Sequence, residues 1–170
     1  MHQKDNFFIT PMLSYFLESR TLMMTKKIRL KELREDCFWT QEQVAQKLKI
    51  ARRTYVEYEL QNRMIPINLL CDLAILYQVS VQYICGLTDY RMPLAKYQEF
   101  DTDRFLSNLK SLRRKYNLTQ KELGEKIACS TENICHYETG ERNIPIDVLV
   151  SLSKLYNLSL DSILGIIKMD

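Results

Sequence analysis

The sequence predicts an all-α fold that is built from two tandem copies of one small domain. Three observations lead to this prediction: a scarcity of turn-forming residues, apolar residues at helical spacing, and an internal repeat. The chain of 170 residues contains only 4 Gly and 4 Pro, fewer than a β-rich fold needs for its turns. Its formal net charge of +3 permits a nucleic-acid partner without demanding one.

The repeat appears when the chain is shifted by 79 residues, because segment 28–86 then aligns with 107–165 without a gap. The two segments are identical at 20 of 59 positions, whereas two unrelated segments would share only a few. This alignment divides the chain into an N-terminal extension at 1–27, a first domain at 28–90, a linker at 91–102 and a second domain at 103–170.

The extension contains the apolar run FFITPMLSYFL at 7–17, which is too short to span a membrane and is interrupted by Pro11. No small-residue cleavage site follows the run, so a signal peptide is not expected. Two interpretations stay open: a short amphipathic extension that is partly helical or disordered, or a translation start at Met23 or Met24.

Each repeat is expected to form five short helices, and the sequence marks where they begin. The first covers about 28–37, where Leu30 and Leu33 share one face. The second follows Thr40 or Thr119, each with a Gln or Glu three residues later, which is the pattern of a capping box. The third is expected at about 51–60 and 130–139, with Pro66 and Pro145 at the first position of the fourth and Ser80 and Ser159 as caps of the fifth.

The second and third helices of each repeat are expected to form a helix-turn-helix. Close crossing of the two helices needs a small residue midway along the second one, and Ala45 and Gly124 occupy that position. Tyr55 and Ile134 are expected to pack the third helix onto the domain. The outer face of the third helix is then free to enter a major groove.

The segments TQEQVAQKLKIARRTYVEYE (40–59) and TQKELGEKIACSTENICHYE (119–138) resemble the helix-turn-helix of the lambda-repressor/Cro-like (Xre-type) family of transcriptional regulators. The resemblance extends through the fourth and fifth helices and covers about 120 of the 170 residues. It implies two tandem five-helix lambda-repressor-like domains. It also implies a cytoplasmic regulator from a bacterium or phage that binds double-stranded DNA in the major groove.

The resemblance further implies a set of DNA-binding residues on the third helix and on the loop after it. Arg side chains suit guanine, Asn suits adenine, Glu suits cytosine, and Thr suits the thymine methyl group. Gln41 and Gln120 match a family glutamine that grips phosphate or braces a side chain of the third helix. The other matching residues are Arg52, Arg53, Thr54, Glu57, Asn62 and Arg63 in the first repeat, and Thr131, Glu132, Asn133, His136, Arg142 and Asn143 in the second. For each residue the alternative is a solvated helix face.

A second family feature concerns the interior of each domain. Arg34 and Arg113 match an arginine that pairs with the glutamate at the positions of Glu59 and Glu138. We therefore expect an internal ion pair that holds the first helix to the third in both repeats.

The sequence departs from the family pattern at three turns. The glycine that ends the third helix is present as Gly140, but Gln61 stands there in the first repeat, and Asn62 is expected to take the left-handed conformation instead. Lys49 and Ala128 replace a frequent turn glycine. Ser130 caps the third helix of the second repeat, whereas Ala51 offers no cap in the first.

The charge of the two repeats leaves a second class of function open. The first repeat (28–90) has eight basic and eight acidic residues, and the second (103–168) has ten and eight. The first is therefore expected to bind DNA weakly or to serve as a partner surface. The alternative function is a protein-interaction module such as an antitoxin, antirepressor or repressor partner, and pairing with a second copy of the chain also stays open.

Other kinds of site find little support in the sequence. The group Cys129, Cys135 and His136 lacks zinc-finger spacing, and Cys129 aligns with the apolar Ile50, so core packing is expected there rather than metal binding. No catalytic motif or phosphate-binding glycine loop is present. The sequence therefore predicts no enzyme activity, no cofactor and no membrane partner.

Overall fold

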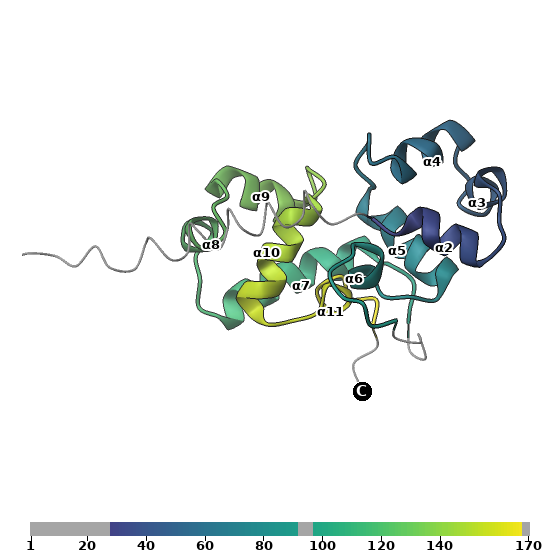
Figure 1. Cartoon of the computed structure of the whole chain (residues 1–170). Coiled ribbons are helices and arrows are strands. Elements are labelled where there is room, and N and C mark those ends of the chain that lie inside the picture. The colour runs from purple at the N-terminus through teal and green to yellow at the C-terminus, as the bar shows by residue number, and fades with distance from the viewer. Residues whose placement is uncertain (1–27, 92–96, 168–170) are drawn as a thin grey trace, which may run out of the picture. The chain divides into compact units, whose positions relative to one another are not determined.

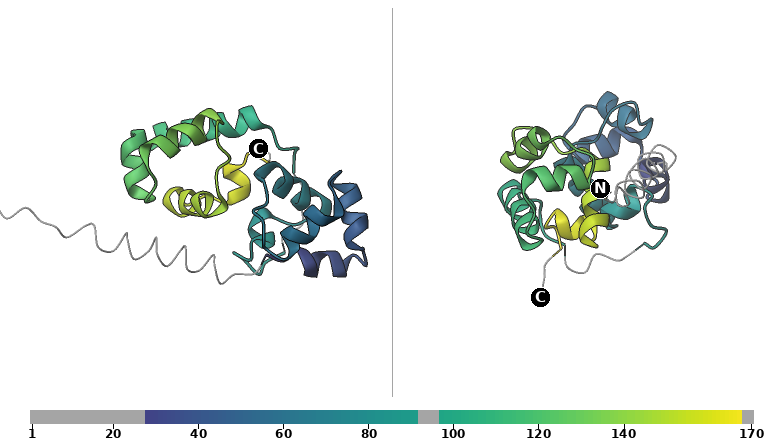
Figure 2. Two further views of the ribbon diagram at one scale, coloured as in Figure 1. Left: turned by 90° about the horizontal axis from the view of Figure 1, so that it is seen from above. Right: turned by 90° about the vertical axis from the view of Figure 1, so that its left-hand side faces the viewer.

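The computed structural model describes residues 28–91 and 97–167, which fold into short α-helices joined by turns (Figures 1 and 2). This confirms the all-α prediction; the interpretations of 1–27 concern residues outside this range. Within the described residues, β structure is limited to one bridge between Tyr97 and Ile167. None of the helices in these ranges is long and apolar enough to cross a membrane.

Each repeat contributes five helices, as the sequence predicts. The first repeat forms α2 (Leu30–Asp36), α3 (Gln41–Lys47), α4 (Arg52–Glu59), α5 (Ile67–Tyr77) and α6 (Val81–Ile84). The second forms α7 (Thr102–Lys115), α8 (Gln120–Lys126), α9 (Thr131–Thr139), α10 (Ile146–Tyr156) and α11 (Leu160–Ile163). Helix α7 is twice as long as its counterpart α2, and it starts where the predicted linker ends.

Side-chain caps fix where the helices begin. Thr40 and Thr119 form complete capping boxes with Gln43 and Glu122, so both predicted boxes are confirmed. The predicted serine caps of α6 and α11 are also present. The two prolines lie one position earlier than predicted. Pro66 and Pro145 have ψ angles of 148° and 152°, so they are N-cap residues with an extended backbone, and the helices start at the next residue.

The two helices of each helix-turn-helix cross at a small residue, as expected. Ala45 is 1% exposed, and a Cβ on Gly124 would lie 2.4 Å from the carbonyl oxygen of Cys129. Tyr55 of α4 and Ile134 of α9 are buried, as expected. These contacts hold the third helix against its domain and leave its outer face uncovered by the rest of the repeat.

The turn that follows α4 differs from the sequence-based expectation. Gln61 itself adopts the left-handed conformation, with a φ of 59°, so the assignment of that role to Asn62 is wrong. Gly140 has a φ of 79° at the matching position of the second repeat. Lys49 and Ala128, which replace a frequent turn glycine, are also left-handed, with φ angles of 54° and 49°. The left-handed backbone of these turns is therefore the same in both repeats, even where a residue other than glycine makes it unfavourable.

The described residues pack into two compact units, one made of 106–158 and the other of 28–91 and 97–105 together with 159–167. Helix α11 of the second repeat thus lies against α6 of the first. Asp161 of α11 is only 1% exposed, and it accepts hydrogen bonds from the backbone N–H of Val81 at 2.9 Å and from the Tyr97 hydroxyl at 2.5 Å. Burial raises the pKa of Asp161, although these hydrogen bonds oppose the shift.

Candidate nucleic-acid interface

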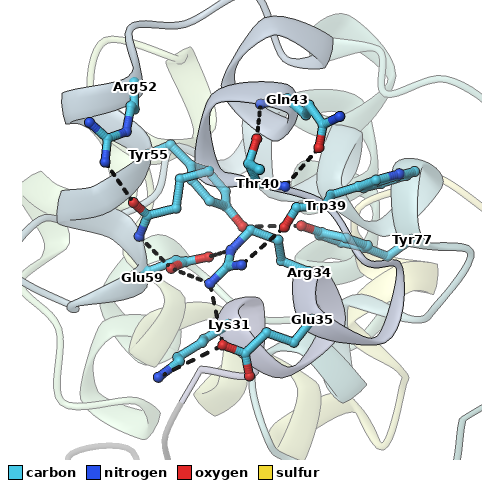
Figure 3. A network of polar contacts seen from close by, with 11 residues as sticks. Lys31, Arg34, Glu35, Trp39, Thr40, Gln43, Arg52, Tyr55, Glu59 and Tyr77 are labelled. Carbon is cyan, nitrogen blue, oxygen red and sulfur yellow. Dashed lines mark hydrogen bonds and ion pairs between the residues drawn. The ribbon is translucent and has the colours of Figure 1, made fainter.

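A buried polar network joins the first three helices of the first repeat (Figure 3). The Nε atom of Arg34 donates to Oε1 of Glu59 at 2.6 Å, and its Nη1 donates to the carbonyl oxygen of Trp39 at 3.0 Å. The Gln41 amide donates to Oε2 of Glu59 at 3.0 Å. The predicted ion pair is confirmed, and we call this Arg–Glu–Gln network the brace.

The second repeat contains the same brace. Arg113 donates to both carboxylate oxygens of Glu138, at 2.6 Å and 2.9 Å, and to the carbonyl oxygen of Leu118 at 2.9 Å. The Gln120 amide donates to Glu138 at 3.0 Å. Of the two family roles for the glutamine, the structure therefore shows the one that supports the third helix.

The electrostatics of the brace are the same in both repeats. The side chains of Glu59 and Glu138 are each 4% exposed. Burial by itself would raise the pKa of these carboxyls, but hydrogen bonds from the arginine and the glutamine outweigh it, so each pKa is lowered. Both carboxylates are therefore charged and paired at neutral pH, which fixes α4 and α9 relative to the helices below them.

The outer face of α4 is rich in arginine. Arg52 and Arg53 are exposed in its first turn, and Thr54 and Glu57 are half-buried beside them. An Nη2 atom of Arg52 donates to Oε1 of Gln41 at 3.4 Å, so the brace extends to this first base-reading candidate (Figure 3). Asn62 and Arg63 are exposed in the loop that follows.

The outer face of α9 carries different chemistry. Thr131 and Glu132 are exposed, and Asn133 and His136 are half-buried. The Asn133 side-chain oxygen accepts a hydrogen bond from Nη1 of Arg142 at 3.0 Å. Asn143 is exposed in the same loop as Arg142. Helix and loop are thus linked by a side-chain contact in the second repeat.

A second contact on this face involves a residue that the sequence reasoning missed. His136 lies between two carboxylates: its Nδ1 is 2.5 Å from Glu141 and its Nε2 is 3.4 Å from Glu132. Glu141 aligns with Asn62 of the first repeat. A comparison of the two repeats could have identified Glu141, because an acidic side chain replaces a neutral one at this loop position. The exposed faces therefore differ in charge: three arginines and one carboxylate in the first repeat, and one arginine and two carboxylates in the second.

The cysteine and histidine group shows no metal-binding geometry. Cys129 is half-buried and Cys135 is exposed. Burial raises the pKa of Cys129, which disfavours the thiolate that metal binding requires. In 28–91 and 97–167 no three His, Cys, Asp or Glu side chains are grouped so that they could hold a metal ion.

Comparison with known proteins finds the same motif twice. A family model described as Helix-turn-helix matches residues 30–84 and again residues 109–163. The Uncharacterized HTH-type transcriptional regulator YobD of Bacillus subtilis (strain 168) is 48% identical over 61 residues, which is 36% of this chain and 54% of that protein. The HTH-type transcriptional regulator ImmR of the same organism is 44% identical over 57 residues, 34% of this chain and 45% of that protein.

The chain spans about half the length of these curated relatives, and each alignment is about as long as one repeat. No solved structure gives a significant match. The two matched segments together cover more than half of the chain. The protein therefore belongs to the helix-turn-helix family, in its Xre-type form, with two tandem copies of the domain.

Proposed function

We propose that this protein is a DNA-binding transcriptional regulator whose two repeats each present one helix, α4 or α9, to a major groove. The observation that carries the proposal is the brace, which is repeated atom for atom in both domains. Compared with well-packed apolar residues of similar volume, a buried ion pair of this kind adds little net stability, so we assign its value to orientation. In both repeats it fixes the helix whose outer face stays exposed.

The side chains on that face support a division of labour between the repeats. Arg52 and Arg53 suit the two major-groove acceptors of guanine, and Asn133 suits adenine. The loop residues Arg63 and Arg142 suit phosphate contacts, which position a domain on DNA without reading its sequence. Because the two faces differ, one chain is proposed to bind an asymmetric composite site, and linking two heads raises their joint affinity without new contacts.

The charges on the exposed faces argue against the expectation, based on the net charge of each repeat, that the first repeat binds DNA weakly. The first repeat is neutral overall, yet its α4 face and following loop expose Arg52, Arg53 and Arg63. Attraction to phosphate depends on the charges that face the DNA, so the first repeat is proposed to provide most of the electrostatic affinity.

The experiment is a salt titration of the full chain on a random duplex. Binding should weaken steeply with salt, because each neutralised phosphate releases counterions. Arg63→Ala should reduce the slope by about 1 and weaken binding to all sequences alike. The matched control is Arg114→Ala, which removes an exposed arginine from α7, outside the helix-turn-helix. Equal slopes for the wild type and Arg63→Ala would remove Arg63 from the interface.

One observation favours a second function, a protein-interaction module, for the second repeat. Glu132 and Glu141 flank His136 on the face that would meet DNA, and carboxylates there repel phosphate. If the titration shows no salt-sensitive binding at all, the protein-interaction function replaces the DNA-binding one.

A further inference from the structure

An unusual residue connects α2 to α3 in the first repeat. Phe38 is 94% exposed, and its φ of 56° lies in the left-handed region. That conformation is strained for a residue other than glycine, and a bulky side chain is rarely found there. The second repeat has Asn117 at the same position with a φ of 53°, and asparagine tolerates this conformation well. The first repeat thus has an exposed aromatic residue at a turn where the second repeat has the asparagine that suits this conformation.

The next residue lines an open groove. Trp39 packs against Tyr77 with ring centroids 5.9 Å apart (Figure 3), and Nζ of Lys47 lies 4.7 Å from the centre of the Trp39 ring. Trp39 and Lys47 line the groove together with Gln43 and Gln46 of α3. The wall of this groove is therefore aromatic and amide in character, with a single charge.

The matching surface of the second repeat is different. Leu118 replaces Trp39, and Glu122 and Glu125 replace the two glutamines. Two exposed carboxylates make that surface unsuitable for an apolar ligand. The combination of an exposed phenylalanine and a tryptophan-lined groove is therefore specific to the first repeat, although both repeats share one fold.

We propose that the groove lined by Trp39, Gln43, Gln46 and Lys47 is the docking site for the apolar segment 7–17 of the same chain. That segment has no charged residue, and four of its eleven residues are aromatic. Docking would bury the aromatic side chains of the segment against Trp39 and Phe38. The free energy gained from this burial would offset the cost of leaving Trp39 and Phe38 exposed to water. The second repeat has neither the aromatic groove nor an apolar segment before its first helix.

The position of the segment in the chain makes the contact reachable. The described residues begin at 28, next to α2, and the seven residues of α2 span about 10 Å before Phe38 and Trp39. The ten residues 18–27 can extend over about 33 Å, so they can lead segment 7–17 back to the groove. Because the segment is tethered this close, docking is intramolecular and a modest contact suffices to keep it bound.

The test uses Trp39 as a reporter, because it is the single tryptophan of the chain. In the full-length protein, the combined substitutions Phe7→Ser, Phe8→Ser and Phe16→Ser should shift Trp39 emission to longer wavelength and increase its quenching by acrylamide. A synthetic peptide of residues 7–17 should reverse both changes in this variant and leave the wild type unaffected. The matched control is Tyr90→Ser, which removes an exposed aromatic residue outside the groove and should change neither signal.

A second variant tests the groove itself. Phe38→Asn installs the residue of the second repeat, so it should raise the thermal midpoint, and when it is added to the triple-substituted chain it should weaken the response to the peptide. Far-UV circular dichroism checks that each variant is folded. The proposal is overturned if the triple substitution leaves emission and quenching unchanged. It is equally overturned if Trp39 emission depends on protein concentration, which would assign the groove to a second copy, or if it changes only when a duplex is added, which would assign it to DNA.

Discussion

The two repeats have nearly the same interior and very different surfaces. The ion pairs of Arg34 with Glu59 and of Arg113 with Glu138 both have an Nε–Oε1 distance of 2.6 Å. The exposed positions of α4 and α9, in contrast, share no residue among those proposed to read bases. Close packing constrains the interior residues of each repeat, whereas the surface residues can differ according to what each repeat binds. The copies share a fold, and the difference between their surfaces supports the proposal that they recognise different partners or sequences.

The interiors themselves differ at one polar contact. In the first repeat the hydroxyls of Tyr55 and Tyr77 are 3.0 Å apart and form a buried hydrogen bond. Ile134 stands in the place of Tyr55 in the second repeat, and the hydroxyl of Tyr156 is buried without a hydrogen-bond partner among the described residues. Tyr156 instead packs against Tyr116, with ring centroids 4.8 Å apart. The first repeat therefore has the better satisfied core.

The largest effect is expected from breaking the brace. Glu59→Gln or Glu138→Gln leaves a mostly buried guanidinium without its counter-charge, which should lower the free energy of unfolding by about 3 kcal/mol in either repeat. The comparison of the two repeats predicts similar losses. Urea denaturation followed by circular dichroism measures them. If Glu138→Gln lowered the free energy of unfolding and Glu59→Gln did not, the two braces would differ in energy despite their shared geometry.

The brace should also make stability depend on pH. The pKa values of Glu59 and Glu138 are lowered in the folded protein, so their contribution is present above the ordinary glutamate value of 4.5 and is lost as the pH falls through the folded pKa. The stability difference between wild type and Glu138→Gln should therefore shrink as the pH falls from 7 to below 4. Asp161 has a raised pKa, so its own effect has the opposite sign, but it cancels in this difference. A difference that stays constant with pH would contradict a charged brace.

The next effect concerns the carboxylates of the α9 face. Glu141→Gln removes a negative charge near the proposed phosphate contact of Arg142, so binding to a random duplex should tighten about tenfold, or by about 1.4 kcal/mol. Glu125→Gln, which neutralises an exposed carboxylate on α8, serves as the control for net charge. Titration by fluorescence anisotropy measures both variants. Equal gains would mean that total charge, rather than the α9 face, limits binding.

A smaller effect is expected from the buried tyrosines. Tyr77→Phe removes the hydrogen bond to Tyr55 and should cost about 1 kcal/mol of stability. Tyr156→Phe removes a hydroxyl without a partner in the described residues, so it should be neutral or slightly stabilising. Thermal denaturation of the two variants side by side provides the measurement. A cost as large for Tyr156→Phe as for Tyr77→Phe would show that the Tyr156 hydroxyl is satisfied.

The smallest effect is expected at the turn after the third helix. Gln61→Gly relieves a left-handed glutamine and should stabilise the first repeat by about 0.5–1 kcal/mol. The reciprocal change, Gly140→Ala, should destabilise the second repeat, because its φ is 79° and a Cβ there would lie 2.9 Å from the Leu106 side chain. Midpoints of thermal unfolding that move in the same direction for both variants would contradict this reading of the turn.

The sequence predicts the repeated features of the structure well. The capping boxes, the serine caps and the small residues at the helix crossing follow from patterns that occur twice in one chain. Both ion pairs follow from the family resemblance, at positions that recur in the two repeats. Features that depend on how neighbouring side chains and turns pack could not be predicted. The burial of Asp161 against α6, the approach of Glu141 to His136 and the left-handed Gln61 all depend on how neighbouring elements pack, which propensity does not report. Glu141 was therefore absent from the predicted site.

The contact between α11 and α6 also decides how the central claim should be tested. Cutting the chain between the repeats would separate Asp161 from Val81 and Tyr97 and expose a buried carboxylate, so isolated halves are poor substitutes for the whole protein. Each repeat is better inactivated by substitutions on its outer face within the full chain.

The most direct measurement is selection of bound duplexes from a random pool by the full-length protein and by two variants. One variant combines Arg52→Ala with Arg53→Ala, and the other combines Thr131→Ala with Asn133→Ala. The wild type should select an asymmetric site with two distinct parts, and each variant should lose preference in a different part, at about 1–3 kcal/mol for each good base contact. A variant that selects the same sequence as the wild type would show that its repeat does not read bases, and would contradict the claim that both do.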